Sequence, residues 1–173
     1  MKILITGGAG YIGSLLTGYL LNKGFEVTVI DIFSFGQSTL NHYYNNKNFN
    51  VEKIDVRDSP RIDPIVKKHD IIIPLAALVG APLCDIRRKE AEETNFEAIK
   101  NMVNNMSNNQ YLIYPTTNSG YGVGEKNKFC TEETKLNPIS LYGKTKTRAE
   151  NYIAENFDNS VRFRLATVFG CSP

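Results

Sequence analysis

The segment TGGAGYIG, residues 6–13, stands between a short apolar run and an apolar segment with helical spacing. The run KILIT (2–6) predicts a strand, and YIGSLLTGYLLNKG predicts the helix after it. Gly7, Gly10 and Gly13 have the spacing G-x-x-G-x-x-G, which allows a tight turn and close approach to a pyrophosphate. The free N–H groups at the start of such a helix attract phosphates. This strand–turn–helix context predicts a dinucleotide-binding loop, and a glycine-rich turn without a ligand is the alternative.

Strand and helix patterns alternate along the rest of the chain. The further strand candidates are FEVTVI (25–30), FNVEKI (49–54), DIIIPLA (70–76), YLIYPT (111–116) and VRFRLA (161–166), and the helical patterns lie at 60–68, 89–107 and 139–157. This alternation predicts an α/β fold, a doubly wound and mostly parallel sheet with helices on both faces. The irregular segment 33–48 predicts a loop with a short helix.

The composition excludes several classes of protein. The 173 residues are 42% hydrophobic and 22% charged, as expected of a globular domain with a core. The net charge is +2 and the basic residues are scattered, so we expect no nucleic-acid partner. No apolar run predicts a membrane span or a signal peptide, so we expect a cytoplasmic protein. The few cysteines and histidines are dispersed and predict neither a disulfide nor a metal site; they are Cys84, Cys130, Cys171, His42 and His69.

An acidic residue follows the second predicted strand. Asp31 comes about 20 residues after the glycine loop, where a carboxylate binds the adenosine ribose hydroxyls. Its charge would repel a 2′-phosphate, and residues 32–37 contain no Arg or Lys to accept one. The sequence therefore favours NAD over NADP. The alternative is that Asp31 caps a turn or a helix.

Tyr142 and Lys146 stand four positions apart in SLYGKTKTRAENY. On one helix their side chains point the same way. The pKa of a free tyrosine is about 10, too high for a base near neutrality, and a neighbouring ammonium favours the phenolate. The same spacing also occurs on solvated helix faces, so the pair is informative only beside the glycine loop and Asp31.

These motifs together resemble the extended short-chain dehydrogenases/reductases, in particular the NAD-dependent sugar-nucleotide epimerase/dehydratase family. The resemblance runs from Thr6 to Gly170 and rests on TGGAGYIG, DVRD (55–58), PLAALVG (74–80), YPTTNSGYG (114–122), the Tyr-x-x-x-Lys pair and RLATVFG (164–170). It implies a Rossmann-type fold, NAD as cofactor and a nucleotide-sugar as substrate.

The resemblance also implies roles for individual residues. Thr117, Tyr142 and Lys146 would be catalytic: Thr117 would donate a hydrogen bond to the substrate oxygen, Tyr142 would act as base, and Lys146 would hold the cofactor ribose. Asn95 would be structural. Asp55 would bind the adenine amino group. The implied cofactor site comprises Gly7, Gly10, Tyr11, Ile12, Gly13, Asp31, Asp55, Val56, Leu75, Ala76, Ala77, Thr116, Tyr142, Lys146, Leu165 and Ala166.

Two positions indicate which reaction to expect. The family's 4,6-dehydratases carry an Asp-Glu pair after the catalytic threonine, and related decarboxylases usually keep the glutamate. This chain has Asn118 and Ser119, which supply neither acid nor base. We therefore expect an epimerase that oxidises its substrate transiently. An NAD-dependent dehydrogenase or reductase and a non-catalytic NAD-sensing regulator are the alternatives. Many relatives have an asparagine at the position of Thr167, where it contacts the nucleotide-sugar.

The resemblance implies that residues 1–173 form the NAD-binding domain and that a smaller C-terminal substrate domain is largely absent. Relatives usually pair as homodimers through two long helices, which the segments 89–107 and 141–157 would supply. The apolar positions in these segments suit either such an interface or helices that face the sheet; examples are Ile99, Met102, Val103 and Ile153.

Overall fold

A computed structural model describes residues 1–36, 38–124 and 129–171. Six parallel strands form one sheet in the order β3-β2-β1-β4-β5-β6. The strands are β1 (Lys2–Thr6), β2 (Glu26–Asp31), β3 (Phe49–Lys53), β4 (Ile71–Pro74), β5 (Tyr111–Thr117) and β6 (Ser160–Leu165). Successive strands are added on one side of β1 up to β3 and on its other side from β4 onward. Ligands of such sheets bind at the carboxyl ends of the strands beside this switch point, here between β1 and β4.

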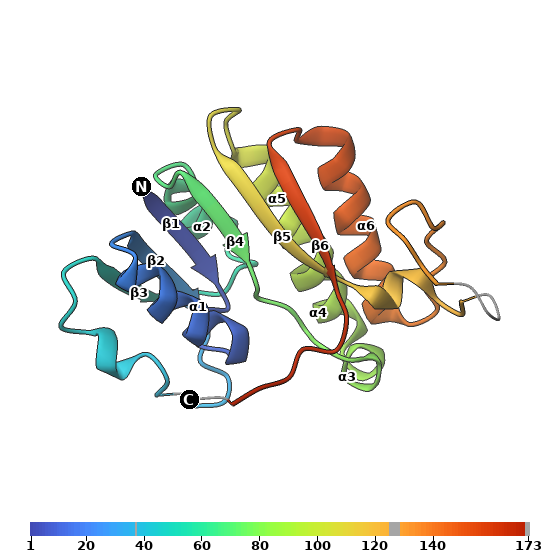
Figure 1. The fold of residues 1–173 in the computed structure, drawn as a ribbon, viewed down its shortest axis with the longest axis horizontal. Helices are drawn as coiled ribbons and strands as arrows, with labels where there is room; N and C mark the ends of the chain where they lie inside the picture. Colours follow the sequence, from blue (N-terminus) through green and yellow to red (C-terminus); the bar gives the residue numbers. More distant parts are fainter. Residues whose placement is uncertain (37, 125–128, 172–173) are drawn as a thin grey trace.

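Helices cover the sheet on both faces, as the sequence predicted (Figure 1). Helix α1 lies over one face and α2, α5 and α6 lie over the other (Figure 1). The helices are α1 (Tyr11–Asn22), α2 (Ser59–Val66), α3 (Ala81–Ile86), α4 (Arg88–Glu92), α5 (Ala98–Asn105) and α6 (Leu141–Asn156). Short 3-10 turns lie at η1 (Asn41–Tyr43) and η3 (Asn118–Tyr121), and a π-helical turn, η2 (Glu93–Glu97), joins α4 to α5.

The long pattern 89–107 is thus interrupted rather than one regular helix. Its apolar positions, which the sequence left between an interface and the core, face the sheet: Ile99 is 3% exposed, Met102 1% and Val103 4%. Ile153 of α6 is fully buried in the same cluster. These residues belong to the core of this domain. Their apolar character therefore does not support the expected dimer.

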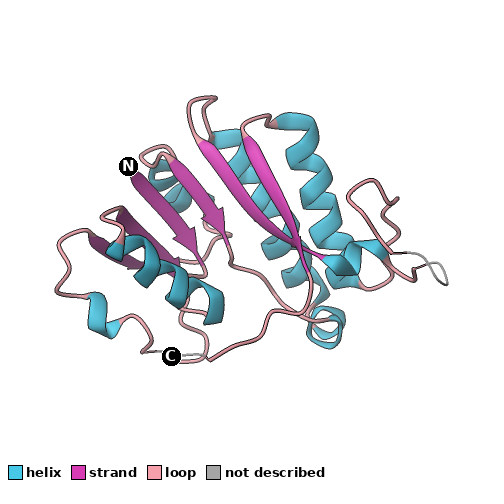
Figure 2. Ribbon diagram, in the orientation of Figure 1, coloured by secondary structure: helices cyan, strands magenta, loops and turns pink. Residues whose placement is uncertain are grey.

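One part of the sheet has no helix over it. In Figure 2 the near face of β5 and β6 is bare, whereas α6 covers the far face. Arg164 of β6 bonds Glu150 of α6, so by alternation Phe163 points to the bare face. Phe163 is 49% exposed. An apolar side chain is thus left in solvent at the edge of the sheet. Among the described helices, none is long and apolar enough to cross a membrane.

Candidate functional site

The glycine loop is held in its shape by close backbone contacts. Gly7 has φ +70°, and a Cβ there would lie 2.6 Å from the backbone nitrogen of Ala76, just after β4. A Cβ on Gly13 would lie 2.5 Å from the Cα of Gly8. Gly10 precedes α1 and makes no side-chain cap hydrogen bond among the described residues. The loop fits a pyrophosphate, because its backbone is tightly packed and stands before a helix N-terminus at the switch point.

Asp31 joins the end of β2 to this loop. Its Oδ2 accepts a hydrogen bond from the N–H of Ala9 across 3.0 Å, and its Oδ1 accepts one from the N–H of Phe33 across 2.8 Å. Asp31 is 9% exposed. Asp31 therefore caps the turn after β2, as the alternative interpretation held, and also lies beside the glycine loop. Its contact with a ribose stays a prediction.

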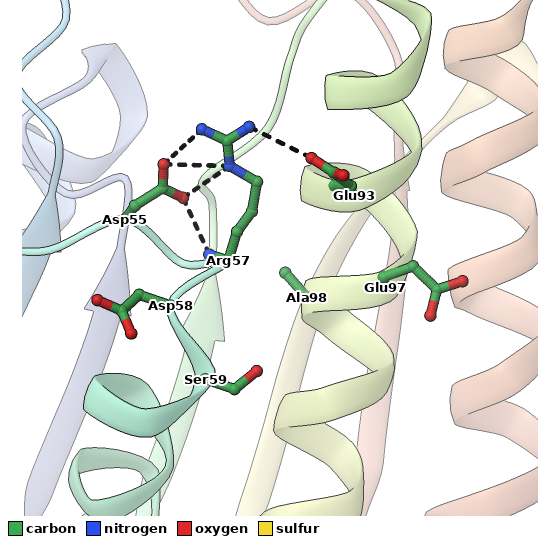
Figure 3. A pocket seen from close by; sticks show the side chains of 7 residues that line it. All are labelled: Asp55, Arg57, Asp58, Ser59, Glu93, Glu97 and Ala98. Carbon is green, nitrogen blue, oxygen red and sulfur yellow. Dashed lines mark hydrogen bonds and ion pairs between the residues drawn. The ribbon is translucent and has the colours of Figure 1, made fainter.

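Asp55 and Arg57 form an ion pair after β3 (Figure 3). The Asp55 carboxylate accepts from Arg57 Nε at 2.9 and 3.1 Å, from Nη2 at 2.5 Å, and from the backbone N–H at 2.9 Å. The hydrogen bonds from Arg57 hold the pKa of Asp55 below its usual value. Arg57 also lies 3.5 Å from Glu93. The pair borders a hollow of about 530 Å³ lined by Asp55, Arg57, Asp58, Ser59, Glu93, Glu97 and Ala98.

The three predicted catalytic residues converge from two elements. Thr117 ends β5, and Tyr142 and Lys146 lie one turn apart on α6. Ser140 starts this helix, because its hydroxyl accepts a hydrogen bond from the N–H of Gly143 across 3.1 Å. The structure places Thr117 beside Tyr142. Burial raises the pKa of the Tyr142 phenol, and hydrogen bonding by Thr117 opposes this effect.

Lys146 is buried one turn after Tyr142 on α6. It is 5% exposed, and its Nζ donates to the carbonyl oxygen of Pro115 across 2.8 Å. Burial lowers the pKa of Lys146 to about 7, against the opposing charge of Glu150. Glu150 is itself paired with Arg164, whose Nη2 lies 2.7 Å from Glu150 Oε1. In general, an ammonium within a few ångströms of a phenol favours the phenolate.

Asn95 ties two segments of the site together. In the π-helical turn, its Oδ1 accepts from the N–H of Leu78 across 2.8 Å and its Nδ2 donates to the Leu78 oxygen across 2.9 Å. Its Nδ2 also lies 3.4 Å from Thr145 Oγ1, and Thr145 donates to the backbone oxygen of Tyr142. Asn95 thus fixes the chain after β4 against the first turns of α6, which agrees with the structural role that the resemblance implies.

The remaining predicted cofactor residues lie at the same edge of the sheet, because the carboxyl ends of parallel strands meet there. Leu75, Ala76 and Ala77 follow β4, Thr116 lies near the end of β5, Leu165 and Ala166 are at the end of β6, Val56 follows β3, and Tyr11 and Ile12 begin α1. Beyond β6 the chain runs back toward α1 (Figure 1). A Cβ on Gly170 would lie 2.6 Å from the Tyr11 hydroxyl.

Several residues of the site escaped the sequence analysis. Arg57, Glu150, Arg164 and Tyr114 had no predicted role. Glu150 stands four positions after Lys146 and Arg57 two positions after Asp55, and both spacings are signals that could have been used. Arg164 and Tyr114 come from strands distant in sequence, so their positions depend on the fold.

Known proteins resemble the chain in sequence and in fold. A sequence profile of the NAD dependent epimerase/dehydratase family matches residues 3–172. A UDP-glucose 4-epimerase of Lactobacillus helveticus is 29% identical over 162 residues, covering 89% of this chain and 46% of that protein. A UDP-N-acetyl-alpha-D-glucosaminuronate decarboxylase of Bacillus cytotoxicus is 33% identical over 124 residues, covering 71% of this chain and 38% of that protein.

Among solved structures, the Bordetella bronchiseptica enzyme WbmH in complex with NAD+ has a TM-score of 0.86 and 27% identity, covering 98% of this chain and 56% of that one. The chain therefore spans 38 to 56% of the length of these three proteins. The match to the family profile extends over nearly all of its residues, and the chain belongs to the NAD-dependent epimerase/dehydratase family.

Proposed function

We propose that this chain is the cofactor-binding and proton-transferring part of an NAD-dependent nucleotide-sugar epimerase. The observation that carries the proposal is the placement of Thr117 beside Tyr142, with Lys146 one turn away on α6. These side chains lie at the edge of the sheet that also bears the glycine loop. Proton-transferring groups and a pyrophosphate-binding loop at one edge suit oxidation of an alcohol next to a dinucleotide.

The chain's own residues would hold and orient the cofactor. The amides of the first turn of α1 would bind the pyrophosphate, and Asp31 would accept hydrogen bonds from the adenosine ribose. Asp55, aligned by Arg57, would face the adenine amino group. NAD, when bound there, would supply a reversible acceptor for a hydride from a sugar carbon.

The proton steps belong to α6 and β5. Thr117 would donate a hydrogen bond to the reacting sugar oxygen and fix its position. Tyr142, as phenolate, would take the hydroxyl proton while the carbon loses its hydride, so the alcohol becomes a ketone. Lys146 would stabilise the phenolate by its charge. Return of the hydride to the opposite face of the ketone carbon, with return of the proton from Tyr142 to the ketone oxygen, would invert the carbon.

The positions after Thr117 favour epimerisation over elimination. Asn118 and Ser119 offer no carboxyl group for loss of water, although relatives of this chain include decarboxylases and epimerases. A dehydrogenase that releases its ketone is the second candidate. A regulator that senses NAD is the third, and the convergence of Thr117, Tyr142 and Lys146 argues against it, because sensing requires none of their proton chemistry.

We propose further that residues 1–173 work as the nucleotide-binding domain of a longer assembly. The bare face of β5 and β6 and the greater length of the relatives support this proposal. A homodimer through α4, α5 and α6 is part of it. Sedimentation of the purified protein tests the dimer: a single species with the mass of one chain would rule it out.

The test of function uses the full reading frame with NAD and UDP-, GDP- and dTDP-linked sugars. Formation of an epimer without net NADH supports the epimerase, and accumulating NADH supports the dehydrogenase. Tyr142→Phe should abolish turnover while NAD affinity is kept. A Tyr142→Phe protein with unchanged turnover would exclude the proposed base, and wild-type protein without NAD binding would exclude the function as a whole.

A further inference from the structure

Tyr114 of β5 lies directly beneath the predicted catalytic lysine. Its ring centre is 4.2 Å from Lys146 Nζ, which places the ammonium over the face of the ring. Tyr114 is fully buried, and Lys146 is 5% exposed. A cation at this distance from an aromatic face is attracted by the ring quadrupole, and the attraction is strongest where water is excluded. The contact therefore stabilises the charged form of a lysine that burial would otherwise neutralise.

The hydroxyl group of Tyr114 does not explain why the residue is there. Its oxygen has no hydrogen-bond partner among the described residues, and burial raises the pKa of the phenol well above its ordinary value. Tyr114 thus stays neutral and brings an unpaired polar atom into the core, which is unfavourable. The ring is the part of Tyr114 that contacts Lys146.

Few other groups can hold the charge on Lys146. The Pro115 carbonyl accepts one N–H across 2.8 Å. The charge of Glu150 raises the pKa of Lys146. However, Glu150 Oε1 is already paired with Arg164, whose Nη2 lies 2.7 Å away and whose Nε lies 2.8 Å away. The titratable and charged groups around the lysine are Tyr142 and Glu150 from α6, Tyr114 from β5, Arg164 from β6 and, beside Tyr142, Cys84 from α3.

We propose that Tyr114 is a positioning residue whose ring face keeps the Lys146 ammonium charged and fixed over the ring. The importance of this contact for turnover rests on the proposed function, because it assumes that Lys146 serves Tyr142 as base. The contact between ring and ammonium does not depend on that assumption, so it can be tested on the protein alone.

The test replaces Tyr114 by phenylalanine and by its 3,5-difluoro and pentafluoro analogues in the full chain. These side chains have nearly the same shape, but fluorine progressively removes the negative potential of the ring face. The pKa of Lys146 is read from NMR spectra of protein with isotope-labelled lysine side chains, and the signal is assigned with Lys146→Met. Thermal unfolding verifies that each variant is folded.

The proposal predicts a graded series. Tyr114→Phe should leave the pKa of Lys146 within about 0.3 of the wild-type value, because the ring remains. The pentafluoro variant should lower this pKa by about 0.5 to 1.5, with the difluoro variant between. Equal pKa values in the phenylalanine and pentafluoro proteins would overturn the proposal.

A second readout separates this inference from the proposed function. The affinity for NAD is measured by calorimetry across neutral pH in the same variants. If charged Lys146 binds the cofactor, the pH at which affinity declines should fall in the pentafluoro protein and stay unchanged in Tyr114→Phe. Unchanged pH dependence throughout the series would count against the role of Tyr114. Absence of NAD binding in wild-type protein would refute the proposed function. The pKa of Lys146 measured by NMR would then still show whether the Tyr114 ring stabilises the Lys146 ammonium.

Discussion

Asp31 Oδ2 accepts a hydrogen bond from the backbone N–H of Ala9 across 3.0 Å, which links the last residue of β2 to the glycine loop. Ala9 is 1% exposed, so its N–H has little access to water if the carboxylate is removed. One side chain therefore shapes the loop and presents negative charge beside it.

Asp31→Ala should lower the free energy of unfolding by about 1–3 kcal/mol, because it leaves a buried donor unpaired. Asp31→Asn is the matched control, since its amide oxygen can keep one of the two bonds. Denaturant unfolding measures both. Equal stability of Asp31→Ala and the wild type would mean that the Ala9 bond is dispensable.

Gly13→Ala should disrupt the loop far more than Gly10→Ala. A Cβ on Gly13 would lie 2.5 Å from Gly8 Cα and 2.7 Å from the Gly7 oxygen, both of them backbone atoms. A Cβ on Gly10 would lie 3.3 Å from the Gly7 oxygen, which a small shift relieves. We expect Gly13→Ala to cost about 1–3 kcal/mol of stability, as overpacking does, and to abolish NAD binding measured by calorimetry. Similar stabilities of the two variants would contradict this geometry.

Arg57→Met should raise the pKa of Asp55, which can be followed by carbon NMR of the carboxyl group. The hydrogen bonds from Arg57 lower this pKa in the folded protein. Their contribution to stability is therefore present above the ordinary aspartate pKa and is lost as pH falls through the lowered value. Both side chains are one-third exposed, so the loss should be at most about 1 kcal/mol.

Arg57→Lys provides the control for Arg57→Met. Lysine keeps the positive charge but lacks the guanidinium group, which can donate two parallel hydrogen bonds. The pKa of Asp55 in Arg57→Lys should therefore lie between its values in the wild type and in Arg57→Met. A pKa of Asp55 that is the same in all three proteins would show that the ion pair is absent in solution.

Acid should weaken the fold through His69. Its Nδ1 lies 2.7 Å from the Ile65 oxygen and its Nε2 lies 2.8 Å from Thr28 Oγ1, and burial lowers its pKa. The unfolded chain binds a proton at His69 more readily than the folded protein does. The stability that neutral His69 contributes is therefore complete above the unfolded pKa of about 6.5 and is lost as pH falls through the folded value.

Unfolding free energies measured over this range test the effect of His69. His69→Gln should flatten the pH dependence, whereas the same change at the exposed His42 should leave it intact. An equal slope in the His69→Gln protein would assign the acid sensitivity to other groups.

The strands and the edge of the sheet that bears the site could be predicted from sequence because they depend on short-range patterns. Short strand patterns, some apolar and some alternating, indicated all six strands, and the order of motifs predicted that the candidate site residues follow their carboxyl ends. The short helix α3 was missed, because six residues carry too little periodicity. The π-helical turn was missed because it is accompanied by bonds between Asn95 and Leu78, which the fold brings together.

The environment of the site residues was less accessible from sequence. The alternation of polar and apolar residues could not show that Lys146 lies over the ring of Tyr114 or that Arg164 neutralises Glu150, because each contact joins a helix to a strand distant in sequence. The partnership of Asp31 with Ala9 likewise depends on how β2 packs beside the glycine loop.

The most direct measurement is the nuclear Overhauser effect between the Tyr142 ring protons and the nicotinamide protons of NAD bound to this chain, with Tyr142→Phe used for assignment. Cross-peaks between the two rings are expected in the complex. Saturating, measurable NAD binding without any such cross-peak would place the phenol away from the reactive ring and contradict the proposed chemistry.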